Sequence, residues 1–341
     1  MTKFLLIGKC RTESNPSSAG GVIVLFEQLI SDFTRLNKNF EILDLNRRNY
    51  LLPNLGVLLN YIKAMIKLPF CDIVFFNGTA GEYKYYSWFF TGFGKLFRKK
   101  VVLRKFAGNF DHYYDHEISG LSKKAIDYAL KNADINYFET MYLIEHFKTT
   151  ANNPRWFPNV RSVSDLAKKN NPFSKRFVFI SNVKRDKGIQ EILEARKDLP
   201  ATFIIDIYGP LNYDCPSHLK DAFKMCYKGV LSSNEVIKTL QKYDVLLLPT
   251  YHKGEGYPGI IIEAFAAGLP VIVTPLKGIK EMVTENASGF FVNPKDSEAL
   301  KQKIKYFTSE NYSIYSEQAK NDFRKFNNED VMKRIIHEIH L

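Results

Sequence analysis

The fold of this chain is decided by residues 248–270, which read LPTYHKGEGYPGIIIEAFAAGLP. The stretch predicts the end of a buried strand, a glycine-rich loop, an apolar helix and a further strand after Gly-Leu-Pro. Glu255 lies in the loop, and Glu263 follows eight positions later in the first turns of the helix. A helix start offers free N–H groups to anionic oxygens, and carboxylates bind hydroxyl groups. The pair of glutamates therefore predicts a ligand that carries both phosphates and sugar hydroxyls.

On both sides of this stretch, short apolar runs alternate with amphipathic segments, which predicts parallel, doubly wound α/β sheets. Strands are expected at 3–8, 41–45, 72–76, 101–106 and 135–138 in the first half, and at 176–181, 202–208, 245–249 and 270–274 in the second. The polar, proline-containing residues 152–172 predict a hinge between the halves. We therefore expect two Rossmann-like domains that face each other across a cleft, at 1–160 and 161–320, and a closing helix within 321–341 that returns to the first domain.

The composition is typical of a packed protein, because 45% of the residues are hydrophobic and 25% are charged. These figures exclude a disordered, collagen-like or disulfide-scaffold chain. The four cysteines are scattered without a C-x-x-C pair, so we expect a reducing cytosol with neither a disulfide nor a metal site. The opening residues are expected to form a strand rather than a signal peptide, and no apolar run reaches the roughly 18 residues of a membrane span.

The net charge of +12 suggests an anionic binding partner. Basic residues are concentrated at 84–105, which has seven of them and no acidic residue. The same segment carries the aromatic residues Tyr85, Tyr86, Trp88, Phe89, Phe90, Phe93 and Phe97. Two interpretations stay open: a helix that docks on an anionic membrane together with the amphipathic stretch at 55–68, or a core helix with a solvated basic end. Nucleic acid is not the expected partner, because no zinc-finger spacing, RNP-like motif or recognition-helix pattern occurs.

The segment with the two glutamates resembles the E-x7-E signature of the retaining glycosyltransferases of family 4, which have the two-domain GT-B fold. The resemblance implies that Glu255 lies by the donor sugar and that Glu263 holds the ribose hydroxyls of the nucleotide. It also implies that a loop wraps the sugar and the distal phosphate, with the residues Gly256, Tyr257, Pro258 and Gly259. The likeness is good over about 177–292 and loose in the first half.

A second stretch, FISNVKRDKGI at 179–189, is similar to the phosphate-binding G-R-x-x-x-x-K-G motif of that family. Lys187 and Gly188 match the motif, and the resemblance assigns Lys187 to stabilising the leaving diphosphate. Asn182 stands where arginine is usual, so the missing positive charge is expected from Lys184 or Arg185. Asn182 and Arg185 are the further expected donor contacts.

Contacts from the first domain are expected at two places. Gly21 ends the run Ser-Ala-Gly-Gly at 18–21, which is similar to a Gly-Gly that contacts the donor phosphates in the family. After the strand at 101–106 the family usually has a histidine near the sugar, and this chain has none there. Asn109 and Asp111 are the candidates for that space, whereas His112 comes several residues late and is expected at the surface.

Taken together, the resemblance implies a retaining glycosyltransferase without a cofactor. No metal is expected, because the chain has no Asp-x-Asp pair to bind a divalent ion. A leaving phosphate oxygen is expected to take the acceptor proton. A UDP-sugar is the favoured donor and a GDP-sugar the alternative. The expected acceptor is a polyprenyl-diphosphate-linked saccharide in bacterial surface-polysaccharide biosynthesis (O-antigen of lipopolysaccharide, capsule or exopolysaccharide), on the cytoplasmic face of the cell membrane.

Two other interpretations are weaker. A GT-B-shaped nucleotide-sugar epimerase would share the nucleotide cleft, but it would need carboxylates as general acid and base and would need no membrane. Release of nucleoside diphosphate would favour the transferase over the epimerase. A non-enzymatic basic module that binds membranes or nucleic acid would show salt-dependent binding to DNA or lipid.

Overall fold

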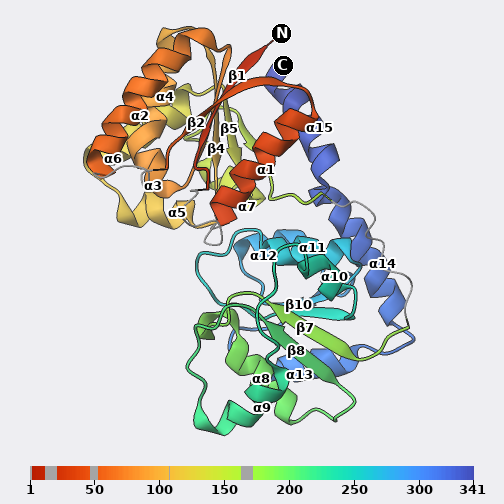
Figure 1. Cartoon of the computed structure of the whole chain (residues 1–341). Helices are drawn as coiled ribbons and strands as arrows, with labels where there is room; N and C mark the ends of the chain where they lie inside the picture. The colour runs from red at the N-terminus through yellow and green to blue at the C-terminus, as the bar shows by residue number, and fades with distance from the viewer. Residues whose placement is uncertain (1, 12–20, 47–52, 107, 163–171) are drawn as a thin grey trace. The chain divides into compact units, whose positions relative to one another are not determined.

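The computed structural model describes residues 2–11, 21–46, 53–106, 108–162 and 172–341 (Figure 1). The chain divides into two compact units, Met1–Pro158 with Arg334–Leu341, and Asn159–Lys333. The change of unit near the C-terminus falls inside the last helix, α15 (Asn328–His340).

The described residues of the first unit form a six-stranded parallel sheet in the order β2-β1-β3-β4-β5-β6. Its strands are β1 (Lys3–Gly8), β2 (Asn39–Asp44), β3 (Ile73–Gly78), β4 (Lys100–Lys105), β5 (Ile135–Phe138) and β6 (Pro154–Trp156). The central strands are continuous apolar runs, because a parallel sheet covered by helices is buried on both faces. Its main helices are α1 (Gly21–Arg35), α2 (Pro53–Lys67), α4 (Trp88–Leu96), α6 (Gly120–Asn132) and α7 (Met141–Phe147), with the last part of α15.

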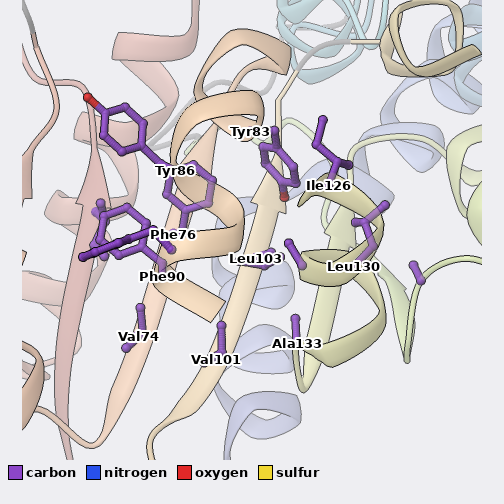
Figure 2. Close-up of a cluster of buried hydrophobic side chains, with 14 of the residues drawn as sticks. Val74, Phe76, Tyr83, Tyr86, Phe90, Val101, Leu103, Ile126, Leu130 and Ala133 are labelled. Carbon is purple, nitrogen blue, oxygen red and sulfur yellow. The ribbon is translucent and has the colours of Figure 1, made fainter. Parts of the chain in front are cut away.

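Alternate residues of these strands face opposite layers. Val74, Phe76, Val101 and Leu103 belong to one core cluster, and Figure 2 shows them facing aromatic and aliphatic side chains from the helical layer. On the other face, the Phe4 ring lies edge-on to Phe33 of α1, with 5.0 Å between ring centroids. Helices therefore cover both faces of the sheet (Figure 1).

Three aromatic side chains of the 84–105 segment lie in this core cluster, and Phe93 and Phe97 pack against it. The side chains of Tyr86 and Phe90 are fully buried and Phe89 nearly so, while Tyr85 and Trp88 remain about two-fifths exposed. The reason is the position of the segment, which connects β3 to β4 and covers the sheet with rings spaced three and four residues apart. The core-helix interpretation holds for these buried rings. No helix in the described ranges is long and apolar enough to cross a membrane.

The described part of the second unit forms a five-stranded parallel sheet in the order β11-β10-β9-β7-β8. The strands are β7 (Arg176–Ile180), β8 (Ile204–Tyr208), β9 (Val245–Leu248), β10 (Val271–Val273) and β11 (Gly289–Phe291). The helices are α8 (Ile189–Lys197), α9 (Lys220–Cys226), α10 (Val236–Leu240), α11 (Gly259–Ala266), α12 (Lys277–Met282), α13 (Ser297–Tyr306) and α14 (Tyr312–Phe323). The prediction of two Rossmann-like, doubly wound α/β units is confirmed.

The strand order of the second sheet reverses at β7. The chain runs from β7 outward to β8, and then returns to the other side of β7 for β9. In such sheets the crevice for ligands lies beyond the carboxyl ends of the two strands at this switch point. The loops after β7 and β9 are the two stretches, 179–189 and 248–270, that the sequence singles out. The first sheet has the corresponding switch point between β1 and β3.

Candidate active site

The loop after β7 reaches the loop after β9 through a glycine. Gly188 has φ +81°, in the left-handed region that L side chains rarely adopt. A Cβ atom at Gly188 would also lie 2.3 Å from the carbonyl oxygen of Pro249. Only glycine therefore permits this approach, which brings Lys187 beside the start of the glycine-rich loop.

Lys187 and Glu255 form an ion pair between these loops, although 68 positions separate them. The two side chains are only 12% and 11% exposed. Thr250 Oγ1 lies 3.4 Å from the same oxygen, Glu255 Oε1, and donates to the Asp186 carbonyl at 3.2 Å. Partial burial strengthens the attraction because less water screens it. The pair presents an ammonium and a carboxylate together at the switch point, which suits a ligand with both phosphate and hydroxyl groups.

A second link joins the two loops, and the sequence did not predict it. Asp186 Oδ2 lies 2.7 Å from His252 Nδ1, and the Asp186 carbonyl accepts a hydrogen bond from the Tyr251 N–H at 2.8 Å. Nothing in the spacing of Asp186 and His252 signals their contact, because 66 positions separate them. These bonds hold the two loops in register and so position Lys187 against Glu255.

Glu263 lies one turn inside α11 and is paired with an arginine. Arg161 Nε donates to Glu263 Oε1 at 2.6 Å, and Arg161 Nη1 donates to Asn159 Oδ1 at 2.8 Å. A Cβ atom at Gly259, the first residue of α11, would lie 1.9 Å from Arg161 Nη2. Gly259 therefore gives the guanidinium room at the helix start. Sequence analysis missed Arg161, because the surrounding residues 152–172 have the composition of a linker.

The helix α12 packs against the glycine-rich loop and supports it. Tyr257 is buried, and its hydroxyl donates to Glu281 Oε2 at 2.5 Å. Gly278 packs so closely on the loop that a Cβ atom there would lie 2.4 Å from the Gly256 carbonyl oxygen. Asn159 Nδ2 donates to the Tyr257 carbonyl at 3.1 Å. The Tyr257 side chain thus fixes the loop conformation, and Pro258 is the residue that precedes the first turn of α11.

The remaining expected donor contacts of the second unit lie at the exit of β7. Asn182 is exposed and follows the strand end by two positions. Arg185 is exposed and begins the short 3-10 turn Arg185–Lys187. The structure therefore gathers Asn182, Arg185 and Lys187 in one loop, and it brings that loop together with Glu255.

Three expected residues belong to the first unit. Gly21 is the exposed first residue of α1, and residues 18–20 lie outside the described ranges. Asn109 is exposed, whereas Asp111 is buried and its Oδ2 accepts a hydrogen bond from the Tyr142 hydroxyl at 3.0 Å. His112, expected at the surface, is exposed there.

The carboxyl end of β4 carries a buried lysine that the sequence analysis did not single out as a site residue. Lys105 is 1% exposed, and burial lowers the pKa of its ammonium to about 8, against the opposing effect of Glu139, Glu82 and Asp111. Its nitrogen lies 4.7 Å from the centroid of the Phe110 ring and donates to the Phe106 carbonyl. The end of β4 thus holds a buried cation, and three carboxylates oppose the lowering of its pKa.

No group of three or more His, Cys, Asp or Glu side chains in the described part of the chain is arranged to hold an ion. The expectation of a metal-free reaction stays a prediction.

Residues 164–326 match the family described as Glycosyl transferases group 1, which is nearly the whole second unit. The chain has the GT-B fold, and its second unit resembles the glycosyltransferases of this family. The solved structure of HepE from Anabaena in complex with UDP has the same fold, with a TM-score of 0.73, 14% identity and coverage of 99% of this chain and 100% of that one.

The chain is also similar in sequence to three curated glycosyltransferases. An uncharacterized glycosyltransferase of Methanocaldococcus jannaschii is 23% identical over 323 residues, which cover 83% of this chain and 81% of the relative. The amylovoran biosynthesis glycosyltransferase AmsK of Erwinia amylovora is 28% identical over 137 residues, 37% of this chain and 34% of its own.

The third relative, from Campylobacter jejuni, is an N,N'-diacetylbacillosaminyl-diphospho-undecaprenol alpha-1,3-N-acetylgalactosaminyltransferase. It is 28% identical over 121 residues, 35% of this chain and 31% of its own. The match to the last two relatives thus spans about a third of their length.

Proposed function

We propose that this glycosyltransferase moves a sugar from a nucleotide-sugar, with a UDP-sugar favoured over a GDP-sugar, to a lipid-linked saccharide during assembly of a bacterial surface polysaccharide. The observation that carries the proposal is the Lys187–Glu255 ion pair at the β7/β9 switch point, next to the start of α11 and the Arg161-bound Glu263. A cation, two carboxylates and free helix N–H groups in one crevice match the phosphates and hydroxyls of such a donor.

In this proposal each site residue has a role that follows from its chemistry. Lys187, with Arg185 and Asn182, binds the diphosphate and stabilises the negative charge that grows on it as the sugar leaves. Glu255 accepts hydrogen bonds from the sugar, and Glu263, oriented by Arg161, accepts them from the ribose. The backbone of Gly256, Tyr257, Pro258 and Gly259 lies against the distal phosphate and the sugar. Gly21, Asn109 and Asp111 contribute contacts from the first unit.

The reaction retains the anomeric configuration and needs no metal or other cofactor in this proposal. The glycosidic bond to the diphosphate breaks, the acceptor oxygen bonds to the anomeric carbon on the same face, and a phosphate oxygen takes the acceptor proton. This route uses the leaving group as the base, so a protein base at the end of β4 is unnecessary. The basic loop after β7 supplies the electrostatic stabilisation.

The proposed acceptor is a polyprenyl-diphosphate-linked saccharide, and the enzyme works as a peripheral protein on the inner face of the cell membrane. The names of two relatives support the choice of acceptor: the Campylobacter transferase is named for a diphospho-undecaprenol acceptor, and the Erwinia one for biosynthesis of a polysaccharide. No nucleic-acid partner is proposed.

The test is turnover of candidate UDP- and GDP-sugars with polyprenyl-diphosphate-linked saccharides in EDTA, followed by release of nucleoside diphosphate. The proposal predicts release that depends on the acceptor, and an NMR coupling constant that shows retention in the product. Epimerised nucleotide-sugar without released diphosphate would overturn it in favour of an epimerase.

A further inference from the structure

The outer face of α2 carries an apolar stripe that no other described part of the chain covers. Leu55, Leu58, Ile62 and Ile66 are spaced three and four residues apart, so they lie on one face of the helix. All four are exposed, Ile66 by 64%, while Ala64 on the opposite face is fully buried in the core cluster. Phe70 follows just after the helix and is 71% exposed. An amphipathic helix normally shows the reverse pattern, with its outer face polar.

The stripe continues onto the neighbouring aromatic segment through Tyr61. The Tyr61 hydroxyl donates to the Tyr85 carbonyl at 2.5 Å, and the Tyr61 ring lies 6.3 Å from that of Trp88. Tyr85 and Trp88 are the two rings of the 84–105 segment that stay about two-fifths exposed. Tryptophan and tyrosine are the residues that favour the boundary between lipid and water.

Positive charge borders this surface. Lys99 Nζ donates to the Pro69 carbonyl at 2.9 Å, which places a cation beside Phe70, and Arg98 next to it is exposed. Lys63 is an exposed residue of α2 itself, on the flank of the apolar stripe. The chain has no acidic residue at 45–71 or at 83–110. Glu41 pairs with Lys67 and Asp134 with Lys95, while Asp72, two positions after Phe70, accepts a hydrogen bond from the Lys3 N–H at 2.8 Å.

We propose that this surface (the outer face of α2 with Phe70, Tyr85 and Trp88) binds directly to an anionic lipid bilayer. The proposal deepens the membrane location given under Proposed function and rests on it. Large apolar side chains gain free energy in the headgroup–acyl boundary, and the basic border attracts anionic headgroups. A second copy of the chain fits less well, because its own basic border would meet this one. The surface differs from the buried rings of 84–105, so the docking elements are mainly those of α2.

The experiment is co-sedimentation of the full chain with vesicles of phosphatidylcholine alone or with 30% phosphatidylglycerol (roughly the anionic fraction that recruits basic surfaces). Wild type is expected to bind the anionic vesicles, and less so in high salt. The variant Ile62→Asp/Ile66→Asp should bind at least ~10-fold more weakly. The matched control Met225→Asp/Val230→Asp changes two equally exposed apolar residues of the second unit and should bind as wild type.

Two outcomes would overturn the proposal. One is equal vesicle binding by the α2 variant and the control, or none by wild type. The other is a wild-type dimer in light scattering that the α2 variant converts to a monomer without any vesicle binding, which would assign the face to a second copy. The assay contains neither donor nor acceptor, and UDP binding measured on the same variants reports separately on the proposed transferase site.

Discussion

Replacing Gly188 by alanine tests the physical basis of the site, because this residue sets the approach of the loop after β7 to the loop after β9. Its φ of +81° costs an L residue about 1–2 kcal/mol. The new methyl group would also lie 2.3 Å from the Pro249 carbonyl oxygen. Because this oxygen belongs to the backbone, the contact could be relieved only by a shift of one of the two loops. Overpacking of this kind costs about 1–3 kcal/mol. Gly188→Ala should therefore lower the free energy of unfolding by about 2–5 kcal/mol.

Gly229 provides the matched control. Its φ is +97°, but a Cβ atom there would meet no heavy atom within 4 Å among the described residues. Gly229→Ala should therefore cost only the conformational part, about 1–2 kcal/mol. Urea unfolding followed by circular dichroism at 222 nm compares the two variants in the same background. Equal destabilisation of both would refute the argument, because it would mean that the contact with Pro249 imposes no constraint.

Three further predictions concern single charges. Lys187→Met should weaken UDP binding at least ~10-fold and uridine binding little in calorimetry, since the ammonium serves the diphosphate; equal losses would contradict that role. Arg161→Gln should lower the free energy of unfolding by about 1–3 kcal/mol in urea titrations, because it leaves the Glu263 carboxylate without its cation, and an unchanged midpoint would contradict this. Burial lowers the pKa of Lys105 from 10.5 to about 8. Between these pH values the unfolded chain binds more protons than the folded chain, so the free energy of unfolding rises with pH. Lys105→Met should remove up to ~1.4 kcal/mol of this rise per pH unit. The measurement compares the unfolding free energies of wild type and variant at about pH 7.5 and 9.5, and parallel pH profiles of the two proteins would contradict the prediction.

Much of the fold could be predicted from the sequence because its signals are local. Buried parallel strands are continuous apolar runs, and helices have their own period, so the alternation in each half indicated two doubly wound units. The glycine-rich loop before α11 was visible for the same reason. Predicted element ends were less accurate, as at β8, which was expected from 202 and begins at Ile204.

The partners of the site residues were not predictable, because they are distant in sequence. Arg161 lies 102 positions from Glu263, in a stretch whose prolines and polar residues indicated only a linker. The bonds of Asp186 to His252 and of Tyr257 to Glu281 carry no local signal either. They depend on which loops the strand order brings together.

The aromatic segment at 84–105 shows a different limit. Its composition suits both a membrane surface and a core, and only the position of β3 and β4 decides which rings are buried. The amphipathic stretch at 55–68 was predicted to accompany this segment at a membrane, but the sequence did not show which face of that helix is exposed. Its leucines and isoleucines have the spacing of a core-facing helix, but the core cluster is instead contacted by Ala64, Val57, Tyr61 and Met65.

The most direct test of the central claim is a thermal-shift measurement with UDP, GDP, ADP and a panel of UDP- and GDP-sugars in EDTA. The account predicts a clear shift with one nucleotide class, UDP by preference. That shift should be lost in Glu263→Ala and kept in Glu317→Ala, an exposed glutamate of the same unit. No shift with any nucleotide, or a shift that Glu263→Ala leaves intact, would contradict the assignment of this crevice to the sugar donor.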